Sequence, residues 1–395
     1  MAERPMAERE AYLDHAATTP MWPAAIEAMT PFFAEFFGNP SGGHAAARTA
    51  KSALEQSRED LAGLLGVEPA EVVFTGGGTE ADNLAVKGAA RACRDRSGAD
   101  TVVTTAFEHK AVLAACERLT GEGFRRSIVP VDGAGIVDLA ALAGEIDERT
   151  ALVSVMLVNN EVGTIQPLDE VAALVRERAP HAVLHTDAVQ AAPWLDLARA
   201  AASADLVSIS AHKFGGPKGT GALVVRRAIA VEPLIEGGGQ EGGIRSGTSN
   251  VAGVVAMTAA LRATAAVRDA QASRVAALRD RLVDGLLVSV PDSFENGDRA
   301  HKVVGNAHVG FRGVEAEALL VLLDRANVYA AAGSSCSSGA TEPSHVLAAM
   351  RVARDDAIGS IRLSLGYPST AEDVDIALAV LPNAIVQLRA AGVAA

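Results

Sequence analysis

The 395-residue chain carries a formal net charge of −13, and 49% of its residues are hydrophobic. The negative charge disfavours a broad surface for nucleic acid or anionic lipid. No uninterrupted apolar run reaches the ~18 residues that a membrane span needs, and the charged N-terminus lacks the apolar stretch of a signal peptide. We therefore expect a cytoplasmic protein with no membrane association and no stable nucleic-acid complex, built from roughly two domains.

Short apolar runs alternate with helical patterns over the first two thirds of the chain. Continuous β-branched runs that alternate with helices indicate a mainly parallel sheet covered on both faces. Helices are expected over 79–94, 107–119 and 168–178. Strands are expected at 72–75, 101–105, 151–158, 183–186, 206–210 and 222–226.

The pattern changes after residue 250. One or two long helices are expected over 251–288, followed by short strands near 303–311, a helix over 314–326, a strand over 360–366 and a terminal helix. We predict an α/β protein with a large domain over 12–260 and a smaller α+β domain over 261–395. The segment up to about residue 30 is a candidate to pack on the small domain.

Polar side chains gather where the expected strands end, which is where ligands bind in open α/β sheets. A glycine run and Thr79 follow the first strand and begin a helix, whose free backbone amides suit an anion. The stretch 215–221, GGPKGTG, is not a phosphate-binding Walker motif, because Gly219 rather than Ser or Thr follows Lys218. No G-x-G-x-x-G fingerprint is convincing, so a dinucleotide is not expected.

The other strand ends carry amides, imidazoles, carboxylates and a lysine. Taken one at a time, each has a structural explanation, such as a turn residue, a helix cap or a surface lysine. Together they favour a flat, anionic, nitrogen-containing cofactor held through a lysine, namely pyridoxal 5′-phosphate (PLP). The set is His109, Asn159, Asn160, Glu161, Asp187, Gln190, Ser210, His212 and Lys213.

The cofactor's aldehyde and phosphate have expected partners in this set. Lys213 is expected to form an imine with PLP, which explains a lysine placed just after a buried strand. The phosphate is expected at the helix start formed by Gly78 and Thr79, with Ser210 and His212 hydrogen-bonding to it.

The ring of PLP has expected partners as well. Asp187 is expected to pair with the pyridine nitrogen and keep it protonated, which makes the ring an electron sink. Gln190 is expected to donate to the ring hydroxyl oxygen, and His109 to stack on the ring face.

The chain resembles the cysteine desulfurases of the NifS/IscS type, which belong to the class V aminotransferases. The resemblance runs in order from about residue 12 to 380, and several of its motifs are long and specific. The residues that carry it are YLDHAATTP, FGNPSGGH, VFTGGGTEADNLAVKG, FEHKAV, VNNEVGTIQP, HTDAVQ, SAHKFGGPKGTGAL, GGGQEGGIRSGTSN, GSSCSSGATEPSHVL and SIRLSLG.

The resemblance implies a fold-type I PLP enzyme that is a homodimer and converts L-cysteine to L-alanine and a protein-bound persulfide. In this family, the threonine that matches Thr248 reaches the phosphate of the neighbouring subunit, and the arginine that matches Arg362 holds the substrate carboxylate. Asn39 and Asn160 match residues of the substrate site. The sulfur is expected to pass to an iron–sulfur scaffold or to apo iron–sulfur proteins, with tRNA thiolation as a further use.

The catalytic nucleophile falls on Cys336, in a loop of small Gly and Ser residues that we expect to move between the cofactor and an acceptor. Cys93 and Cys116 lie in helical patterns and are interpreted as structural. The three cysteines are too scattered for a disulfide framework or a zinc site, which fits a reducing compartment. No resident metal is predicted, although a transient iron–sulfur ligand role stays open for Cys336.

Lys213 and His109 are the expected proton-transfer groups, and the sequence does not divide the individual steps between them. The closest rival is another class V enzyme, such as a selenocysteine lyase or a kynureninase-like hydrolase. A rival of another kind is a non-catalytic protein that keeps the fold and binds partners. The intact set of Lys213, Asp187, His109 and Cys336 argues against that second rival.

Overall fold

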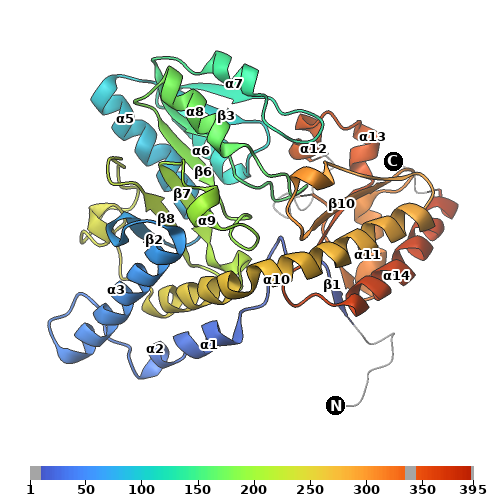
Figure 1. The fold of residues 1–395 in the computed structure, drawn as a ribbon, viewed down its shortest axis with the longest axis horizontal. Coiled ribbons are helices and arrows are strands. Elements are labelled where there is room, and N and C mark those ends of the chain that lie inside the picture. Colours follow the sequence, from blue (N-terminus) through green and yellow to red (C-terminus); the bar gives the residue numbers. More distant parts are fainter. Residues whose placement is uncertain (1–9, 334–343, 393–395) are drawn as a thin grey trace.

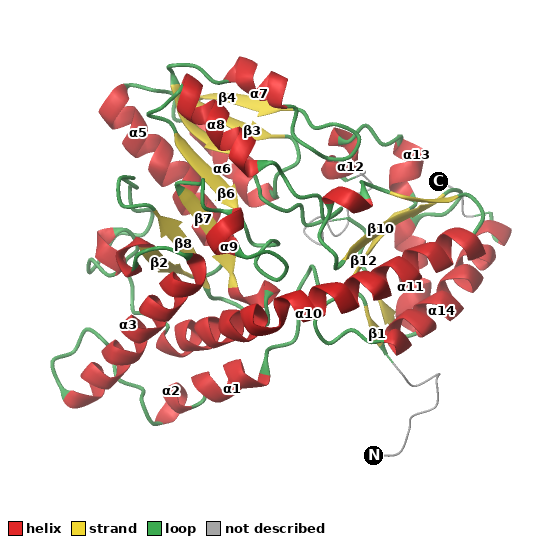
Figure 2. Cartoon of the chain, viewed as in Figure 1, coloured by secondary structure: helices red, strands yellow, loops and turns green. Residues whose placement is uncertain are grey.

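A computed structural model describes residues 10–333 and 344–392 (Figure 1). A seven-stranded sheet with helices on both sides forms the larger part of the molecule, and a smaller sheet lies beside it (Figure 2). Cys336 and most of its loop lie outside the described residues, so the expected movement of that loop remains a prediction.

The large sheet has the strand order β2-β8-β7-β6-β5-β3-β4. Neighbouring strands are parallel except at β8, which is antiparallel to both β2 and β7. The predicted α/β class with a mainly parallel sheet is therefore confirmed. The strands are β2 (Val72–Thr75), β3 (Thr101–Thr105), β4 (Arg125–Val129), β5 (Thr150–Ser154), β6 (Val183–Asp187), β7 (Leu206–Ser210) and β8 (Gly221–Val225).

The edge strand β4 was not among the expected strands. Its residues Arg125, Arg126 and Ile128 are exposed, so the apolar run that identifies a buried strand is missing. Charged side chains are a usual device for protecting an edge strand from further pairing. The expected strand 151–158, in contrast, ends at Ser154.

Successive side chains along each strand point to opposite faces of the sheet and pack into two separate hydrophobic cores. Val183 and Leu206 pack with the helices α4, α5 and α6 on one face, and Leu184 and Val207 pack with α3, α8 and α10 on the other. The helix expected over 79–94 is found as α4, a π-helical stretch (Leu84–Gly88) and α5. The helices of this part are α1 (Pro23–Met29), α2 (Pro31–Ala34), α3 (Ala45–Leu65), α4 (Gly78–Asn83), α5 (Ala89–Ser97), α6 (Lys110–Thr120), α7 (Leu139–Glu145), α8 (Leu168–Arg178) and α9 (Leu197–Ala200).

The smaller part has an antiparallel sheet in the order β12-β10-β9. A two-stranded parallel pair, β1 (Ala11–Tyr12) with β11 (Val328–Tyr329), ties the N-terminal segment to it. The remaining elements are α10 (Val251–Ser289), β9 (Ser293–Glu295), β10 (Asn306–Phe311), α11 (Ala316–Arg325), α12 (His345–Ala349), α13 (Arg354–Ile358), β12 (Ser360–Ser364) and α14 (Ala371–Ala390).

The long helix α10 joins the two parts (Figure 1). Met257 and Leu261 near its start belong to the core of the large sheet, whereas Val275 and Leu282 belong to the core of the small one. By length and composition alone α10 could cross a membrane, but 56% of its apolar window is buried. It is therefore explained as a core helix. The expected domain boundary after residue 260 falls within this helix and stays a prediction.

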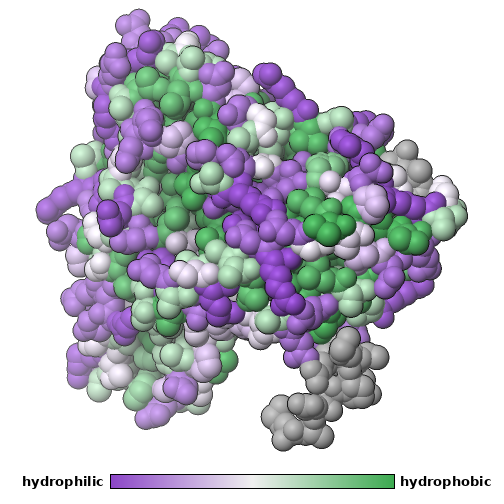
Figure 3. All heavy atoms as spheres, turned by 45° about the vertical axis from the view of Figure 1, so that its right-hand side comes forward, coloured by the Kyte–Doolittle hydropathy of each residue, from purple (hydrophilic) through white to green (hydrophobic). Residues whose placement is uncertain are grey.

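Hydrophilic and hydrophobic residues are interspersed over the face of the molecule drawn in Figure 3. The segment of α1 and α2, however, exposes three large apolar side chains close together in sequence. Ile26 is 50% exposed, Phe33 66% and Phe37 72%.

Candidate active site

A cavity of about 270 Å³ lies at the ends of β6 and β7 and the start of α4. Most of the residues predicted for cofactor and substrate line it. They are Gly78, Thr79, His109, Asn160, Asp187, Gln190, Ser210, His212, Lys213 and Arg362, together with Ala16, Ala17, Asp82, Met156 and Val189.

The start of α4 leaves space for an anion. Gly77 has a φ of 137°, a conformation that favours glycine. A Cβ added to Gly78 would come within 2.8 Å of Val189 Cγ2 and 3.3 Å of the Ser210 Cβ. The first amides of a helix have no partner within the helix. Two glycines therefore keep open a pocket with donors at its base.

Lys213 lies three residues after the end of β7, in a short 3₁₀ turn. Its Nζ donates hydrogen bonds to the backbone oxygens of Ala16 at 2.6 Å and Ala17 at 2.8 Å. The Nε2 of Gln190 donates to the same Ala16 oxygen at 2.7 Å. The N-terminal segment thus positions the lysine, a contact between residues nearly 200 positions apart that the sequence did not reveal.

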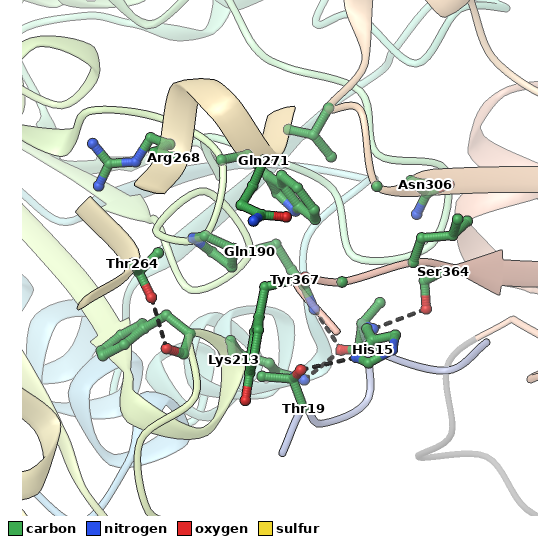
Figure 4. Close-up of a pocket in the computed structure, with 18 of the residues that line it drawn as sticks. His15, Thr19, Gln190, Lys213, Thr264, Arg268, Gln271, Asn306, Ser364 and Tyr367 are labelled. Carbon is green, nitrogen blue, oxygen red and sulfur yellow. Dashed lines mark hydrogen bonds between the residues drawn. The ribbon is translucent and has the colours of Figure 1, made fainter. Parts of the chain in front are cut away.

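A second hollow of about 50 Å³ lies beside Lys213 and Gln190, between the N-terminal segment, α10 and the end of β12 (Figure 4). Trp22 and Tyr367 stack there with ring centres 3.7 Å apart. His15 Nδ1 and Thr19 Oγ1 are 2.8 Å apart. Lys213 therefore borders two hollows, of which the larger contains the carboxylates of Asp82 and Asp187 and the imidazoles of His109 and His212.

Asp187 and His109 both line the larger cavity, with side-chain oxygen and nitrogen atoms within 4.8 Å of each other. Burial raises the pKa of Asp187, while the nearby His109 and Lys213 lower it. Its Oδ1 accepts a hydrogen bond from the Val189 N–H at 2.9 Å. Burial lowers the pKa of His109, and Lys213 lowers it further against the opposing effect of Asp187. A neutral imidazole at pH 7 follows, which can accept or donate a proton.

His109 also caps α6, because its Nδ1 accepts the Ala111 N–H at 3.1 Å. Oxygen and nitrogen atoms of Asp82, His109 and Asp187 lie within 4.8 Å of one another. Such a set could surround a cation, but the Lys213 amine in the same cavity would oppose it.

Arg362 comes from the small sheet and closes one side of the cavity. It is 1% exposed; its Nη2 pairs with Asp14 Oδ1 at 2.7 Å, and its Nη1 donates to the Asn160 carbonyl at 2.9 Å. Its Nε has no hydrogen-bond partner among the described residues. Asp14 was not predicted as a partner, although a buried arginine needs a counter-charge.

Asn39 and Thr248 do not line the cavity of this chain. Both are exposed, and the Asn39 Oδ1 accepts a hydrogen bond from Ser41 N at 3.0 Å. The loop of Thr248 is held by two ion pairs, Arg245 with Glu80 at 2.7 Å and Arg58 with Glu241 at 2.7 Å. A single chain thus presents these two residues to its surroundings.

The family model described as aminotransferase class-V matches residues 11–377. The chain belongs to this family. It is 46% identical over 390 residues to an IscS-like cysteine desulfurase of Mycobacterium tuberculosis, with 98% of each chain covered. It is 42% identical to a cysteine desulfurase IscS of Methanosarcina thermophila, covering 96% of this chain and 92% of the relative.

Solved structures agree with this class V assignment. A NifS-like protein, 36% identical, superposes with a TM-score of 0.89 over 95% of this chain and 99% of its own. The structure of SspA in complex with cysteine, 31% identical, has a TM-score of 0.79 over 91% of this chain and 100% of its own. The predicted family and the fold-type I architecture are therefore confirmed.

The described residues of this class V chain fit PLP. A lysine, a buried carboxylate and a glycine-lined helix start surround one cavity, which matches an aldehyde, a ring nitrogen and a phosphate. Burial also argues against either of the described cysteines as the catalytic nucleophile. Cys93 and Cys116 are both buried, and burial raises the pKa of Cys116 to about 12, so its thiol is a poor nucleophile.

Proposed function

We propose that this protein is a PLP-dependent cysteine desulfurase that converts L-cysteine to L-alanine and retains the sulfur as a persulfide on Cys336. One observation carries the proposal. Lys213, Asp187 and His109 converge on a single cavity beside the glycine-lined start of α4. The names of relatives at 42–46% identity support cysteine as the substrate, as does the complex of the structural neighbour SspA with cysteine.

The bound cofactor supplies an electron sink next to the substrate's Cα. The Lys213 amine, oriented by the Ala16 and Ala17 carbonyls, removes the Cα proton. Asp187 would pair with the ring nitrogen: burial raises the pKa of its carboxyl group, while the Val189 N–H and Lys213 oppose that effect and favour the ionised form. The neutral His109 accepts or donates a proton at the substrate's sulfur or Cβ.

Arg362 and Asn160 are proposed to bind the substrate's carboxylate at one end of the cavity. The guanidinium is already anchored by Asp14 and the Asn160 carbonyl, which leaves Nε without a partner among the described residues. A carboxylate that approached this side would satisfy a buried donor, and such charge-assisted hydrogen bonds are strong. Substrate binding would therefore need little rearrangement of the arginine.

The acceptor of the persulfide sulfur is proposed to be an iron–sulfur scaffold or an apo iron–sulfur protein in the cytoplasm. The direct test incubates the purified, PLP-loaded protein with L-cysteine and a reducing thiol. We expect alanine and sulfide in equal amounts, and a mass increase of one sulfur on Cys336 when the thiol is left out. Turnover of L-selenocysteine with none of L-cysteine would replace the proposal with a selenocysteine lyase.

We also propose a homodimer in which Thr248 and Asn39 of one chain complete the cavity of the other. Both residues are exposed and neither lines the cavity of its own chain, and the apolar side chains of Phe33 and Phe37 lie just before Asn39 in the sequence. Mixed dimers test this. A Lys213→Ala chain paired with a Thr248→Ala chain would contain one site in which both residues are intact. Wild-type cofactor affinity in half the sites supports the shared site, and its absence argues against it.

A further inference from the structure

The cofactor cavity contains a second buried carboxyl group whose role the proposed mechanism does not use. Asp82 lies on α4, one turn after its glycine-lined start, and is 2% exposed. It lines the same cavity as Asp187, which is 4% exposed. Their carboxylate oxygens lie within 4.8 Å of each other. Two acids therefore share one nearly dry space.

Among the described residues Asp82 makes no salt bridge with a lysine or arginine; Lys213 lines the same cavity, and a ring nitrogen of the neutral His109 lies within 4.8 Å of its carboxylate. The Oδ1 of Asp82 has no hydrogen-bond partner among these residues, and lies 3.7 Å from His185 Nε2. The nearby Ser208 hydroxyl lowers the pKa of Asp82. Glu108 and Asp187 are the charged groups that act on it, and both raise its pKa in addition to the larger effect of burial.

His185 does not act as the missing cation. It is two residues before Asp187 on β6 and so lies on the same face of the sheet. Its Nδ1 is 2.8 Å from the Ser154 hydroxyl and its Nε2 is 3.0 Å from the Ser208 hydroxyl. Burial lowers the pKa of His185 to about 3, so the ring is neutral at pH 7. The groups on this side of Asp82, namely Ser154, His185 and Ser208, are thus all uncharged.

Asp187 has the opposite surroundings. Burial raises the pKa of Asp187, but the Val189 N–H donates to its Oδ1 at 2.9 Å and the Lys213 amine favours its ionised form. When two carboxyl groups share a site, they cannot both be ionised, and the proton stays on the one with the poorer stabilisation. That group is Asp82.

We propose that Asp82 is a positioning residue that keeps its proton at neutral pH, so that Asp187 is left as the single negative charge facing the cofactor's ring nitrogen. The inference rests on the proposed function only for the identity of the ring. A protonated Asp82 adds no charge that competes with Asp187, and its O–H fills a donor position that a carboxylate would lack. Because Asp82 is neutral, the single positive charge of the protonated ring nitrogen faces one carboxylate, that of Asp187, rather than two.

The test compares Asp82→Asn, Asp82→Ala and Asp187→Asn. Asparagine has the shape and the donor capacity of a protonated aspartic acid. We therefore expect Asp82→Asn to keep the PLP dissociation constant within roughly threefold, since at most one neutral hydrogen bond changes. Asp187→Asn should weaken PLP binding by roughly 10-fold or more, because it removes a charge-assisted contact. Asp82→Ala should lower kcat with little change in KM, and Asp82→Asn should restore it.

A spectroscopic readout is independent of turnover. Infrared spectra of the cofactor-free wild type at pH 7.5 should show the carbonyl stretch of protonated Asp82, beside a separate contribution of the buried Glu108 carboxyl group that is identified by its loss in Glu108→Gln. The Asp82 contribution should disappear in Asp82→Asn, persist in Asp187→Asn, and shift in Asp82→Glu. The last variant keeps the test decisive if Asp82→Asn does not fold.

Two results would overturn the inference. One is an unchanged infrared spectrum in Asp82→Asn. The other is a loss of PLP affinity in Asp82→Asn as large as that in Asp187→Asn, which would mean that Asp82 is ionised. Failure of the proposed function is a different outcome, because a wild type that never bound PLP would still show the protonated carboxyl group.

Discussion

The two halves of the predicted site behave differently in this chain. The strand-end half consists of Asp187, Ser210 and Lys213: the first two end neighbouring parallel strands, Lys213 follows at the same edge of the sheet, and all three line one cavity. The loop half consists of two other residues. Asn39 and Thr248 belong to exposed loops and line no part of that cavity. Strand ends are fixed by the hydrogen bonds of the sheet, whereas loops on the surface take their place from whatever covers them. The difference is consistent with the proposed homodimer, in which one half of the site is built within a chain and the other half between chains.

Lys213→Ala is the strongest way to break the strand-end half. We expect turnover of L-cysteine to fall by at least ~10³-fold, because the variant loses both the covalent anchor and a proton-transfer group. PLP should still bind, more weakly and without its covalent absorbance, since the phosphate pocket and Asp187 remain. Alanine formation and the absorbance spectrum measure the two effects. Alanine production at the wild-type rate would remove the central claim.

Cys336→Ser tests a residue that belongs to neither half as described. We expect PLP and cysteine to bind normally, while persulfide formation is lost and desulfuration falls by roughly 10³-fold, because a serine cannot take up the sulfur. Cys93→Ser and Cys116→Ser are the matched controls, since both thiols are buried. If either control abolished activity while Cys336→Ser did not, the nucleophile would be another cysteine.

Asp187→Asn breaks the strand-end half without removing the lysine. We expect kcat to fall by about 10²-fold or more, because an amide cannot keep the ring nitrogen protonated. The melting temperature should change little or rise, because the variant removes a buried charge. Steady-state kinetics and thermal unfolding separate the two effects. Unchanged turnover would place Asp187 away from the ring nitrogen.

Arg245→Ala tests the loop half by freeing the segment that carries Thr248. Arg245 pairs with Glu80 at 2.7 Å and is part-buried, so the loop should lose one of the two ion pairs that hold it. We expect PLP affinity to fall by roughly 3–10-fold, as for the loss of one partly exposed charged hydrogen bond. Arg262→Ala, whose ion pair with Asp60 is more exposed, is the control. If the two variants lowered PLP affinity equally, the Thr248 loop would have no specific role in cofactor binding.

The sequence predicted what depends on regular elements and missed what depends on contacts between distant segments. Apolar runs located the central strands, and the residues that follow them located Asp187 and Lys213. The partners Ala16 and Asp14 could not be found in this way, because they meet Lys213 and Arg362 only through the fold. Asp82 and His185 carried a weak signal that was overlooked, namely a polar position on the inner side of α4 and another two residues before Asp187.

Buried titratable groups near the cavity should also make the stability of the protein depend on pH. Glu108 is completely buried beside His109, and burial raises its pKa to about 8, with Thr105 and Met156 hydrogen-bonding to one oxygen only. Because the folded pKa lies above the unfolded value, its contribution to stability is complete below about pH 4.5 and is lost as the pH rises through 8.

His308 in the small sheet supplies the comparison, with the opposite sign. Burial lowers its pKa to about 3 from 6.5, so the unfolded chain takes up the proton first as the pH falls. Its contribution is complete above about pH 6.5 and is lost toward pH 3, at up to about 1.4 kcal/mol per pH unit. Chemical unfolding of the cofactor-free protein between pH 4.5 and 8 measures both. Glu108→Gln should flatten the decline toward pH 8, and His308→Gln the decline toward acid. If both variants followed the wild-type curve throughout, neither group would be buried in the ionisation state that the structure implies.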